Sequence, residues 1–321
     1  MTTIVLDKTQ SINFKACPYT KADLPPVKAF TMDSPIEDII EGMKEAGGCI
    51  IRNACSIELL DEIKKEITPF VDADEVWDGD FFPPQTKKAS GLIGKAPSSA
   101  KALLDNKVYN EVCDAFLTHK MSWWVGEELH TGVSKPQVNN SICFRIGPGA
   151  SNQPLHRDDA LHHPQYGYID KYPEDLGTIT RDDSIGFFIA CSKSTKENGA
   201  TRFIPGSHKW DVGCPPTEEL VYHAELEKGD AFIFLASCYH GGSANKTKDE
   251  YRLLISCFMT RGYLRQEENQ YLAIPMDVIK KLPEKYARMI GYDLSTPYGG
   301  WVESKDPYCV VDPTVKSNID I

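Results

Sequence analysis

The stretch QVNNSICFRIG, residues 137–147, alternates between two kinds of side chain. Its apolar residues share one side of an extended chain: Val138, Ile142, Phe144 and Ile146. The other side carries Gln137, Asn139, Ser141, Cys143 and Arg145. A period of two is that of a β-strand with two different faces. The polar face is a candidate cavity lining, with the alternative that Arg145 pairs with an acidic neighbour.

Short strands and turns continue after this stretch. Further strands are predicted at residues 184–191, 200–204, 221–226, 230–235 and 251–259. The segments ENGA, PGSH, EKGD and GGSANKTKDE separate them as turns. Strands of this length and spacing favour two antiparallel sheets in a jelly-roll barrel. The predicted fold class is therefore mainly β with flanking helices (α+β).

The sequence before this region predicts helices. Residues 34–70 read as a helix, a short strand CIIR and a second helix from Ser56 to Ile67. Ser34 is the expected N-cap with Pro35 at the first helical position, and Gly47 is expected to end the first helix. A third helix is predicted from about residue 100 to 119.

A long segment with aromatic and proline residues, VWDGDFFPPQTKKASGLIGKAPSSA at 76–100, separates the second and third helices. A loop of this length is typically functional, so we expect a lid or substrate wall. Trp77, Phe81 and Phe82 either wall an apolar substrate or form the small core of the loop itself.

Residues 1–321 are expected to form a single domain, since no repeat or linker divides them. Its parts are an N-terminal arm (1–33), a helical layer with the lid loop (34–134), a jelly-roll core (135–263) and a C-terminal extension (264–321).

Composition excludes several classes of protein. A net charge of -11 argues against a nucleic-acid partner. No apolar run is long enough to cross a bilayer, and the start MTTIVLDKTQ lacks the features of a signal peptide. The ten cysteines are scattered without a CxxC pair, which favours reduced core residues over disulfides or a zinc site. We therefore expect a cytoplasmic protein without a membrane partner.

Two stretches carry candidate metal ligands. In QPLHRDD (153–159), His156 and Asp158 lie two residues apart and share one side of an extended chain. The pair alone is weak evidence for a metal site, because the HxD pattern occurs often by chance. In AFIFLASCYHGG (231–242), however, an apolar strand runs directly into His240. Two imidazoles and one carboxylate form the facial arrangement that leaves open positions on ferrous iron.

A basic residue follows at a suitable place. Iron that activates dioxygen needs a co-substrate such as a 2-oxo acid, whose far carboxylate requires a fixed cation. Arg252 lies twelve residues after His240 and begins the strand RLLISCFM. Its guanidinium is able to form a bidentate ion pair inside the barrel.

These motifs resemble the phytanoyl-CoA dioxygenase family of iron(II)- and 2-oxoglutarate-dependent oxygenases. The resemblance rests on QPLHRDD, on ENGATRFIPGSHKW at 197–210, on HGGSAN from His240, and on Arg252. It covers the chain from the strand at Cys49 to LRQEENQYL at 264–272. It is closest to fungal and bacterial members that act on secondary metabolites.

The resemblance implies a double-stranded β-helix, cupin-like in form, with Fe(2+) and with 2-oxoglutarate and O2 as co-substrates. The implied iron ligands are His156, Asp158 and His240. The implied 2-oxoglutarate-binding residues are Gln153, Thr201 and Arg252. A homodimer is the expectation from fungal relatives. Residues 160–183 depart from the family pattern and are expected at the substrate mouth.

The implied reaction oxidises a mid-sized, largely apolar small molecule by hydroxylation, desaturation or oxidative rearrangement, and releases succinate and CO2. Asp158 disfavours halogenation, because a carboxylate fills the position that a halide would need. One alternative is a non-catalytic, metal-binding partner subunit of a homologous oxygenase. Another is a cupin-type metal isomerase, which would leave Arg252 unexplained. His162 and His163 are expected at the rim, and His208 in a structural hydrogen bond.

Overall fold

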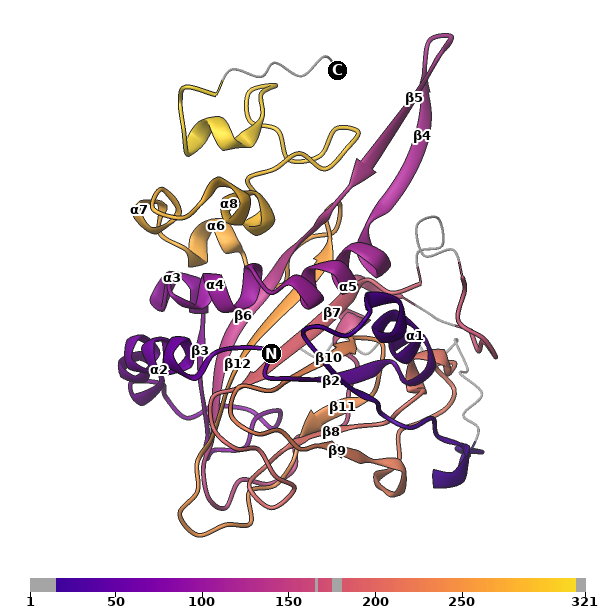
Figure 1. Ribbon diagram of the computed structural model, residues 1–321, viewed down its shortest axis with the longest axis vertical. Helices are drawn as coiled ribbons and strands as arrows, with labels where there is room; N and C mark the ends of the chain where they lie inside the picture. Colours follow the sequence, from indigo (N-terminus) through magenta and orange to yellow (C-terminus); the bar gives the residue numbers. More distant parts are fainter. Residues whose placement is uncertain (1–15, 165–166, 175–180, 316–321) are drawn as a thin grey trace.

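The computed structural model describes residues 16–164, 167–174 and 181–315. These residues form a seven-stranded sheet, a three-stranded sheet and a two-stranded hairpin, with helices around them (Figure 1). The large sheet has the order β1 (Ala29–Thr31), β2 (Gly48–Arg52), β10 (Ala231–Leu235), β7 (Ser184–Ala190), β12 (Arg252–Arg261), β6 (Pro136–Ile146), β3 (Thr86–Ser90). The small sheet has the order β11 (His240–Gly242), β8 (Thr201–Phe203), β9 (Tyr222–Ala224).

The two sheets face each other across an aromatic core. The ring of Phe203 on β8 lies 5.1 Å from that of Phe232 and 6.5 Å from that of Phe234, both on β10. Within the large sheet, β1 and β2 are parallel and the other pairs are antiparallel. Two facing sheets of mainly antiparallel strands form the predicted jelly roll.

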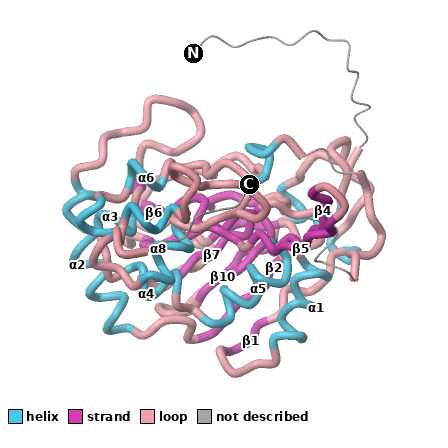
Figure 2. Tube along the Cα trace, turned by 90° about the horizontal axis from the view of Figure 1, so that it is seen from above, coloured by secondary structure: helices cyan, strands magenta, loops and turns pink. Residues whose placement is uncertain are grey.

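Helices cover the opposite face of the large sheet (Figure 2). The ring of Tyr109 on α5 (Lys107–Leu117) stacks on Phe187 of β7 with centroids 4.4 Å apart. Its hydroxyl donates to the carbonyl oxygens of Ile185 at 2.9 Å and Cys257 at 3.2 Å. Because the buried hydroxyl is satisfied by carbonyls of two strands, α5 is fixed in position on the sheet.

The first two helices follow the predicted order, with shifted ends. Helix α1 (Ile36–Ala46) has Pro35 as its N-cap, one position later than predicted. Gly47 ends it with φ 76°, and a Cβ there would lie 2.3 Å from Cys238 Sγ, so only glycine fits. Helix α2 (Ile57–Asp72) has Ser56 as its N-cap, as predicted, but continues past Ile67 to Asp72.

Two predictions for the helical layer are wrong. The helix expected at 100–119 is two helices, α4 (Ser99–Leu104) and α5, because the Asn106 side chain caps a new helix by accepting from Tyr109 N–H at 3.0 Å. The expected loop at 76–100 contains strand β3 and helix α3 (Leu92–Lys95). Its segment TKKAS is polar but pairs with the edge of β6, so backbone pairing prevails over weak local propensity.

The hairpin of β4 (His119–Val125) and β5 (Glu128–Ser134) was not predicted. It projects from the body of the molecule (Figure 1). Gly126 occupies the turn with φ 57°. The Trp123 Nε1–H donates to Tyr298 Oη at 3.0 Å, which ties the hairpin to the C-terminal segment.

Asn139, Ser141 and Arg145, on the polar face of β6, are not among the residues that line the cavity of the predicted site. Arg145 pairs with Asp72 of α2, with Nη1 and Oδ1 2.7 Å apart. Ser141 Oγ accepts from the Ile93 N–H of α3 at 3.4 Å. The alternative of an acidic partner for Arg145 is therefore confirmed.

The C-terminal extension contains α6 (Gln270–Ala273), α7 (Met276–Ile279) and α8 (Glu284–Ile290). The ends of the predicted arm and extension (1–15 and 316–321) and parts of the predicted mouth segment (165–166 and 175–180) lie outside the described residues. Among the helices of the described ranges, none has the length and hydropathy needed to span a bilayer.

Candidate active site

His156 pairs with β11 through an isolated antiparallel bridge, and Asp158 begins a short 3-10 helix (Asp158–His162). The backbone N–H of His156 donates to the His240 carbonyl at 3.0 Å, and that of His240 donates to the His156 carbonyl at 2.9 Å. The Asp158 N–H donates to the Ala236 carbonyl at 3.1 Å. Paired backbones bring the predicted ligands together from two distant stretches of sequence.

The three side chains converge on one point. The carboxylate of Asp158 lies between the histidines, with Oδ1 3.2 Å from His156 Nε2 and Oδ2 3.1 Å from His240 Nε2. One ligand atom from each residue lies within 4.8 Å of the other two. Among the described residues, this is the one group of histidine, cysteine and acidic side chains close enough to hold a metal ion.

Both imidazoles are oriented through their other nitrogen. His156 Nδ1 lies 2.8 Å from the Pro154 carbonyl, and His240 Nδ1 lies 3.1 Å from the Cys238 carbonyl. A carbonyl only accepts, so each Nδ1 donates its N–H to a carbonyl, and each Nε2 is the nitrogen that faces Asp158 and would bind a metal ion. This donor set is the one that binds ferrous iron facially.

The charges of the three residues are coupled. Burial raises the pKa of Asp158, but His240 and the hydrogen bonds from both histidines outweigh it and hold the pKa well below its usual value. Burial lowers the pKa of His156, whereas the hydrogen bond and charge of Asp158 raise it, and the net direction is upward. The carboxylate therefore stays ionised and attracts positive charge to this point, as a metal site requires.

Arg252 lies in the same cavity, at the start of β12. It is 3% exposed, and its Nη2 donates to Thr201 Oγ1 at 2.8 Å while Nε donates to Ser194 Oγ at 3.2 Å. No ion pair joins it to a carboxylate of the described chain. Burial lowers its pKa to about 9. A buried cation with only neutral partners has a strong preference for an added anion.

The structure also places Gln153 and Thr201 in this cavity. Gln153 Oε1 accepts from the Gly242 N–H at 3.0 Å, which directs its amide nitrogen away from the backbone. Thr201 on β8 orients Arg252 through its hydroxyl. All six predicted site residues thus line one cavity.

The cavity has a volume of about 820 Å³, its open mouth included. Its walls are mostly aromatic and aliphatic: Phe81, Phe82, Ile142, Phe144, Ile146, Phe188, Leu254 and Phe258. The Phe81 ring packs against His156 with centroids 4.8 Å apart. Trp77 is not among the lining residues and packs on Phe82 and under Lys88 instead.

Sequence reasoning missed five polar lining residues: Thr86, Asn140, Ser151, Ser243 and Glu267. Asn140 lies on the otherwise apolar face of β6, at the register of Ile142 and Phe144. That position was the available signal, because a polar residue within an apolar face is unusual. No sequence period marks Glu267, since it follows β12 in irregular chain.

Two of the histidines outside the candidate iron ligands make structural hydrogen bonds. His162 Nε2 donates to the Arg265 carbonyl at 3.1 Å, and the buried His208 donates through Nε2 to the Lys44 carbonyl at 3.0 Å. Burial lowers the pKa of His208 to about 3, so it stays neutral. Asp159, beside the candidate ligand Asp158, is buried, with 1% exposure.

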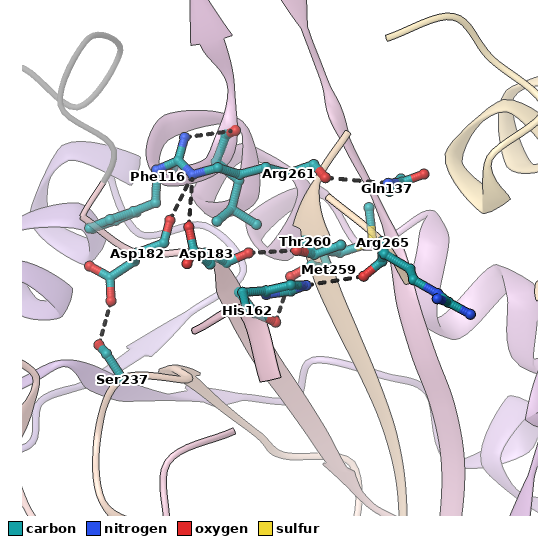
Figure 3. A network of polar contacts seen from close by, with 12 residues as sticks. Phe116, Gln137, His162, Asp182, Asp183, Ser237, Met259, Thr260, Arg261 and Arg265 are labelled. Atoms are coloured by element: carbon teal, nitrogen blue, oxygen red, sulfur yellow. Dashed lines mark hydrogen bonds and ion pairs between the residues drawn. The ribbon is translucent and has the colours of Figure 1, made fainter. Parts of the chain in front are cut away.

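Figure 3 shows a network of polar contacts that joins the end of β12 to neighbouring segments. Arg261 donates to the carbonyl oxygens of Phe116 at 3.1 Å, Leu117 at 3.2 Å and Asp182 at 2.9 Å. The end of β12 is thereby fixed to α5 and to the chain before β7. The His162 contact then ties the candidate ligand loop to the chain after β12.

Known proteins share both sequence and fold with this chain. A profile of the phytanoyl-CoA dioxygenase family matches residues 43–253. Dioxygenase himG of Aspergillus japonicus is 38% identical over 308 residues, with 93% of each chain covered. Dioxygenase cnsJ of Penicillium expansum is 34% identical over 290 residues, covering 89% of this chain and 85% of the relative.

Solved structures share the architecture. The crystal structure of HygX from Streptomyces hygroscopicus with nickel and 2-oxoglutarate bound superposes with a TM-score of 0.53. The match covers 73% of this chain and 90% of HygX at 14% identity, which shows a common fold. The family profile extends from α1 to Leu253, directly after Arg252. The chain therefore belongs to the phytanoyl-CoA dioxygenase family, and it is a dioxygenase.

Proposed function

We propose that this protein is an iron(II)- and 2-oxoglutarate-dependent dioxygenase that oxidises a mid-sized, largely apolar small molecule and releases succinate and CO2. One observation carries the proposal. A buried arginine, which has no carboxylate partner among the described residues, lies in the same cavity as two histidines and an aspartate whose ligand atoms converge.

Three residues would hold the iron: His156, Asp158 and His240. When bound, iron(II) supplies the centre at which dioxygen and the 2-oxo acid react. The chain fixes the ligands in advance, because the Pro154 and Cys238 carbonyls hold the imidazole rings and Asp158 lies between them. Asp158 also occupies the position that a halide would need, which favours oxidation over halogenation.

Three further residues would hold 2-oxoglutarate: Gln153, Thr201 and Arg252. The far carboxylate of the oxo acid would neutralise Arg252 and relieve the cost of its burial. Thr201 already orients that guanidinium. Gln153 offers an amide donor from the opposite segment, held in place by the Gly242 N–H.

The aromatic walls of the cavity exclude water from the reacting carbon and fit an apolar substrate. Hydroxylation, desaturation and oxidative rearrangement all begin with the same oxidising centre. The substrate geometry within these walls would select among them.

The proposed setting is secondary-metabolite biosynthesis in the cytoplasm, by a homodimer. Support for a reducing compartment comes from the ten cysteines, all of which are unpaired. Support for an assembly comes from apolar side chains on the projecting hairpin: Trp124, Val125, Leu129 and Val133 are exposed. Sedimentation velocity of the purified protein measures the oligomeric state.

The test of the chemistry is succinate formation from 2-oxoglutarate in the presence of iron(II), ascorbate and dioxygen. We expect succinate from the native protein, and loss of both iron(II) binding by calorimetry and succinate formation in His156→Ala. The matched control is His130→Ala on the exposed hairpin, which should leave both unchanged. Full iron binding and turnover in His156→Ala would refute the proposed iron site.

A further inference from the structure

Glu267 is the one charged residue of the described cavity lining that the proposed chemistry does not use. The others are the three candidate iron ligands and Arg252. Glu267 follows β12 and remains accessible at the cavity mouth. A solvated rim carboxylate would need no support, so the contacts around it decide whether it forms a site.

Two asparagines of β6 hold this carboxylate. The Nδ2 groups of Asn140 and Asn139 both donate to Oε2, the latter at 3.4 Å. The Glu267 N–H in turn donates to Asn139 Oδ1 at 2.7 Å. Within the described part of the chain, Oε1 accepts no hydrogen bond. One oxygen is therefore anchored while the other is available to a ligand.

The burial and hydrogen bonding of Asn140 support this assignment. It is 4% exposed, its one recorded side-chain hydrogen bond goes to Glu267, and its Oδ1 is buried without a partner. An unsatisfied buried oxygen is unfavourable and rare. The Asn140 amide fixes one carboxylate while its own oxygen stays unsatisfied. This combination indicates a functional position more than a packing position.

The chain around Glu267 is fixed as well. Gln137 Nε2 donates to the Leu264 carbonyl at 2.8 Å, and Gln266 Nε2 donates to the Val138 carbonyl at 2.7 Å. His162 binds the Arg265 carbonyl from the opposite side (Figure 3). The carboxylate is thus positioned in advance on a supported loop, as substrate recognition requires.

No ion pair of the described chain neutralises Glu267. Desolvation of the carboxylate where it contacts β6, and next the negative charge of Asp158, raise its pKa, although the residue as a whole is exposed. A positive group placed against Oε1 would relieve both effects. Arg252 is not available for that role, because its proposed partner is the oxo acid.

We propose that Glu267, positioned by Asn140, recognises a protonated amine on the substrate at the cavity mouth, while the aromatic walls enclose the apolar remainder. This inference rests on the proposed function, because it assigns Arg252 to 2-oxoglutarate. In this arrangement, Arg252 in the inner part of the cavity binds the co-substrate, and Glu267 at the mouth binds the substrate.

The test uses the full-length protein loaded with nickel(II) and 2-oxoglutarate, with three pairs of probes that differ in charge: benzylamine and benzyl alcohol, 2-phenylethylamine and 2-phenylethanol, tryptamine and tryptophol. Calorimetry measures each affinity. We expect at least one amine to bind the native protein about tenfold more tightly than its alcohol, since hydrogen bonds to charged groups contribute this much. If no amine is preferred, the proposal is refuted.

Glu267→Gln should remove this preference and leave alcohol binding unchanged. Glu268→Gln is the matched control, since it removes the same charge from a residue outside the cavity lining and should keep the preference. Asn140→Ala should reduce the preference several-fold, in line with a positioning residue. An unchanged preference in Glu267→Gln would overturn the proposal.

The two proposals fail separately. A native protein that forms succinate in the presence of iron(II) but binds no amine more tightly than its alcohol would uphold the proposed function and refute amine recognition. Conversely, a native protein that forms no succinate but loses its amine preference on Glu267→Gln would retain the recognition site and refute the oxygenase chemistry.

Discussion

The inner and outer walls of the cavity are built differently. The inner wall consists of strand residues that are almost fully buried, such as His240 and Arg252 at 3% exposure each. The outer wall comes from irregular chain and is accessible, with Phe81 at 38% exposure and Glu267 also exposed. Strand register fixes the groups for shared chemistry, whereas loops vary without disturbing the core. Under the proposed function, reaction type and substrate choice would thus reside in separate parts of the fold.

The strongest challenge to this division is the loss of an inner-wall ligand. His240→Ala should abolish measurable succinate formation, a loss of about a thousandfold or more, because two remaining ligands leave the iron poorly held. His223→Ala on β9, outside the cavity lining, should change the rate less than twofold. Retained turnover in His240→Ala would show that the chemistry lies elsewhere.

Arg252→Ala should raise the KM for 2-oxoglutarate about a hundredfold, since truncating a buried charge partner weakens binding strongly. Arg252→Lys should recover part of this loss, because a cation remains. Arg145→Ala, which removes a guanidinium on the helix-facing side of β6, should leave KM unchanged. An unaltered KM in Arg252→Ala would remove the co-substrate from the inner wall.

The buried interior also predicts a dependence of stability on pH. The pKa of His208 in the folded state, about 3, is below its unfolded value near 6.5. Below pH 6.5 the unfolded chain takes up a proton that the folded chain does not, so stability falls as pH falls. Between pH 7 and 5 we expect this residue to lower the free energy of unfolding by about 2 kcal/mol.

Denaturant unfolding of the native protein and His208→Gln at both pH values measures this effect. The glutamine retains an N–H for the Lys44 carbonyl but does not titrate, so its stability should fall less toward pH 5. Parallel pH profiles would contradict a buried neutral histidine.

On the outer wall, Phe81→Ala should weaken the binding of 2-phenylethylamine about fivefold, because one aromatic contact is lost. The KM for 2-oxoglutarate should stay within about twofold of the native value. Trp77→Ala is the matched control, since Trp77 is outside the cavity lining. Equal losses in both measurements would mean that the two walls are not independent.

The smallest effect is expected at the projecting hairpin. Trp124 is 66% exposed, so Trp124→Ser should change the free energy of unfolding by less than about 0.5 kcal/mol. Succinate formation at low protein concentration should be unchanged. A marked loss of activity would instead indicate that this hairpin contributes to a site in an assembly.

The sequence predicted the inner wall far better than the outer one. Alternation in β6 and the apolar run of β10 reflect burial directly, so strand positions follow from side-chain pattern. His156, Asp158 and His240 were found because the HxD spacing and ligand chemistry constrain one another, although Asp158 begins a 3-10 helix and does not continue an extended strand. Glu267 was missed because its place depends on loop contacts with Asn139 and Asn140, which no local period encodes.

Element boundaries failed for definable reasons. The break between α4 and α5 depends on a single cap at Asn106, within a stretch otherwise typical of helix. The hairpin β4–β5 was hidden because its residues are mostly exposed, although Met121 and Trp123 alternate with more exposed neighbours. Local hydrophobic patterns reflect burial, so they do not predict elements that are stabilised by backbone pairing alone.

Strand β12 begins with Arg252 and ends with Arg261, and its antiparallel register pairs these residues with opposite ends of β6. One guanidinium faces the cavity and the other binds carbonyl groups of α5. A single inserted residue between them would send one of the two to the wrong side of the sheet. The length of β12 therefore sets the spacing of the two guanidinium groups. Insertions or deletions within the strand should be far more damaging than substitutions of its apolar residues.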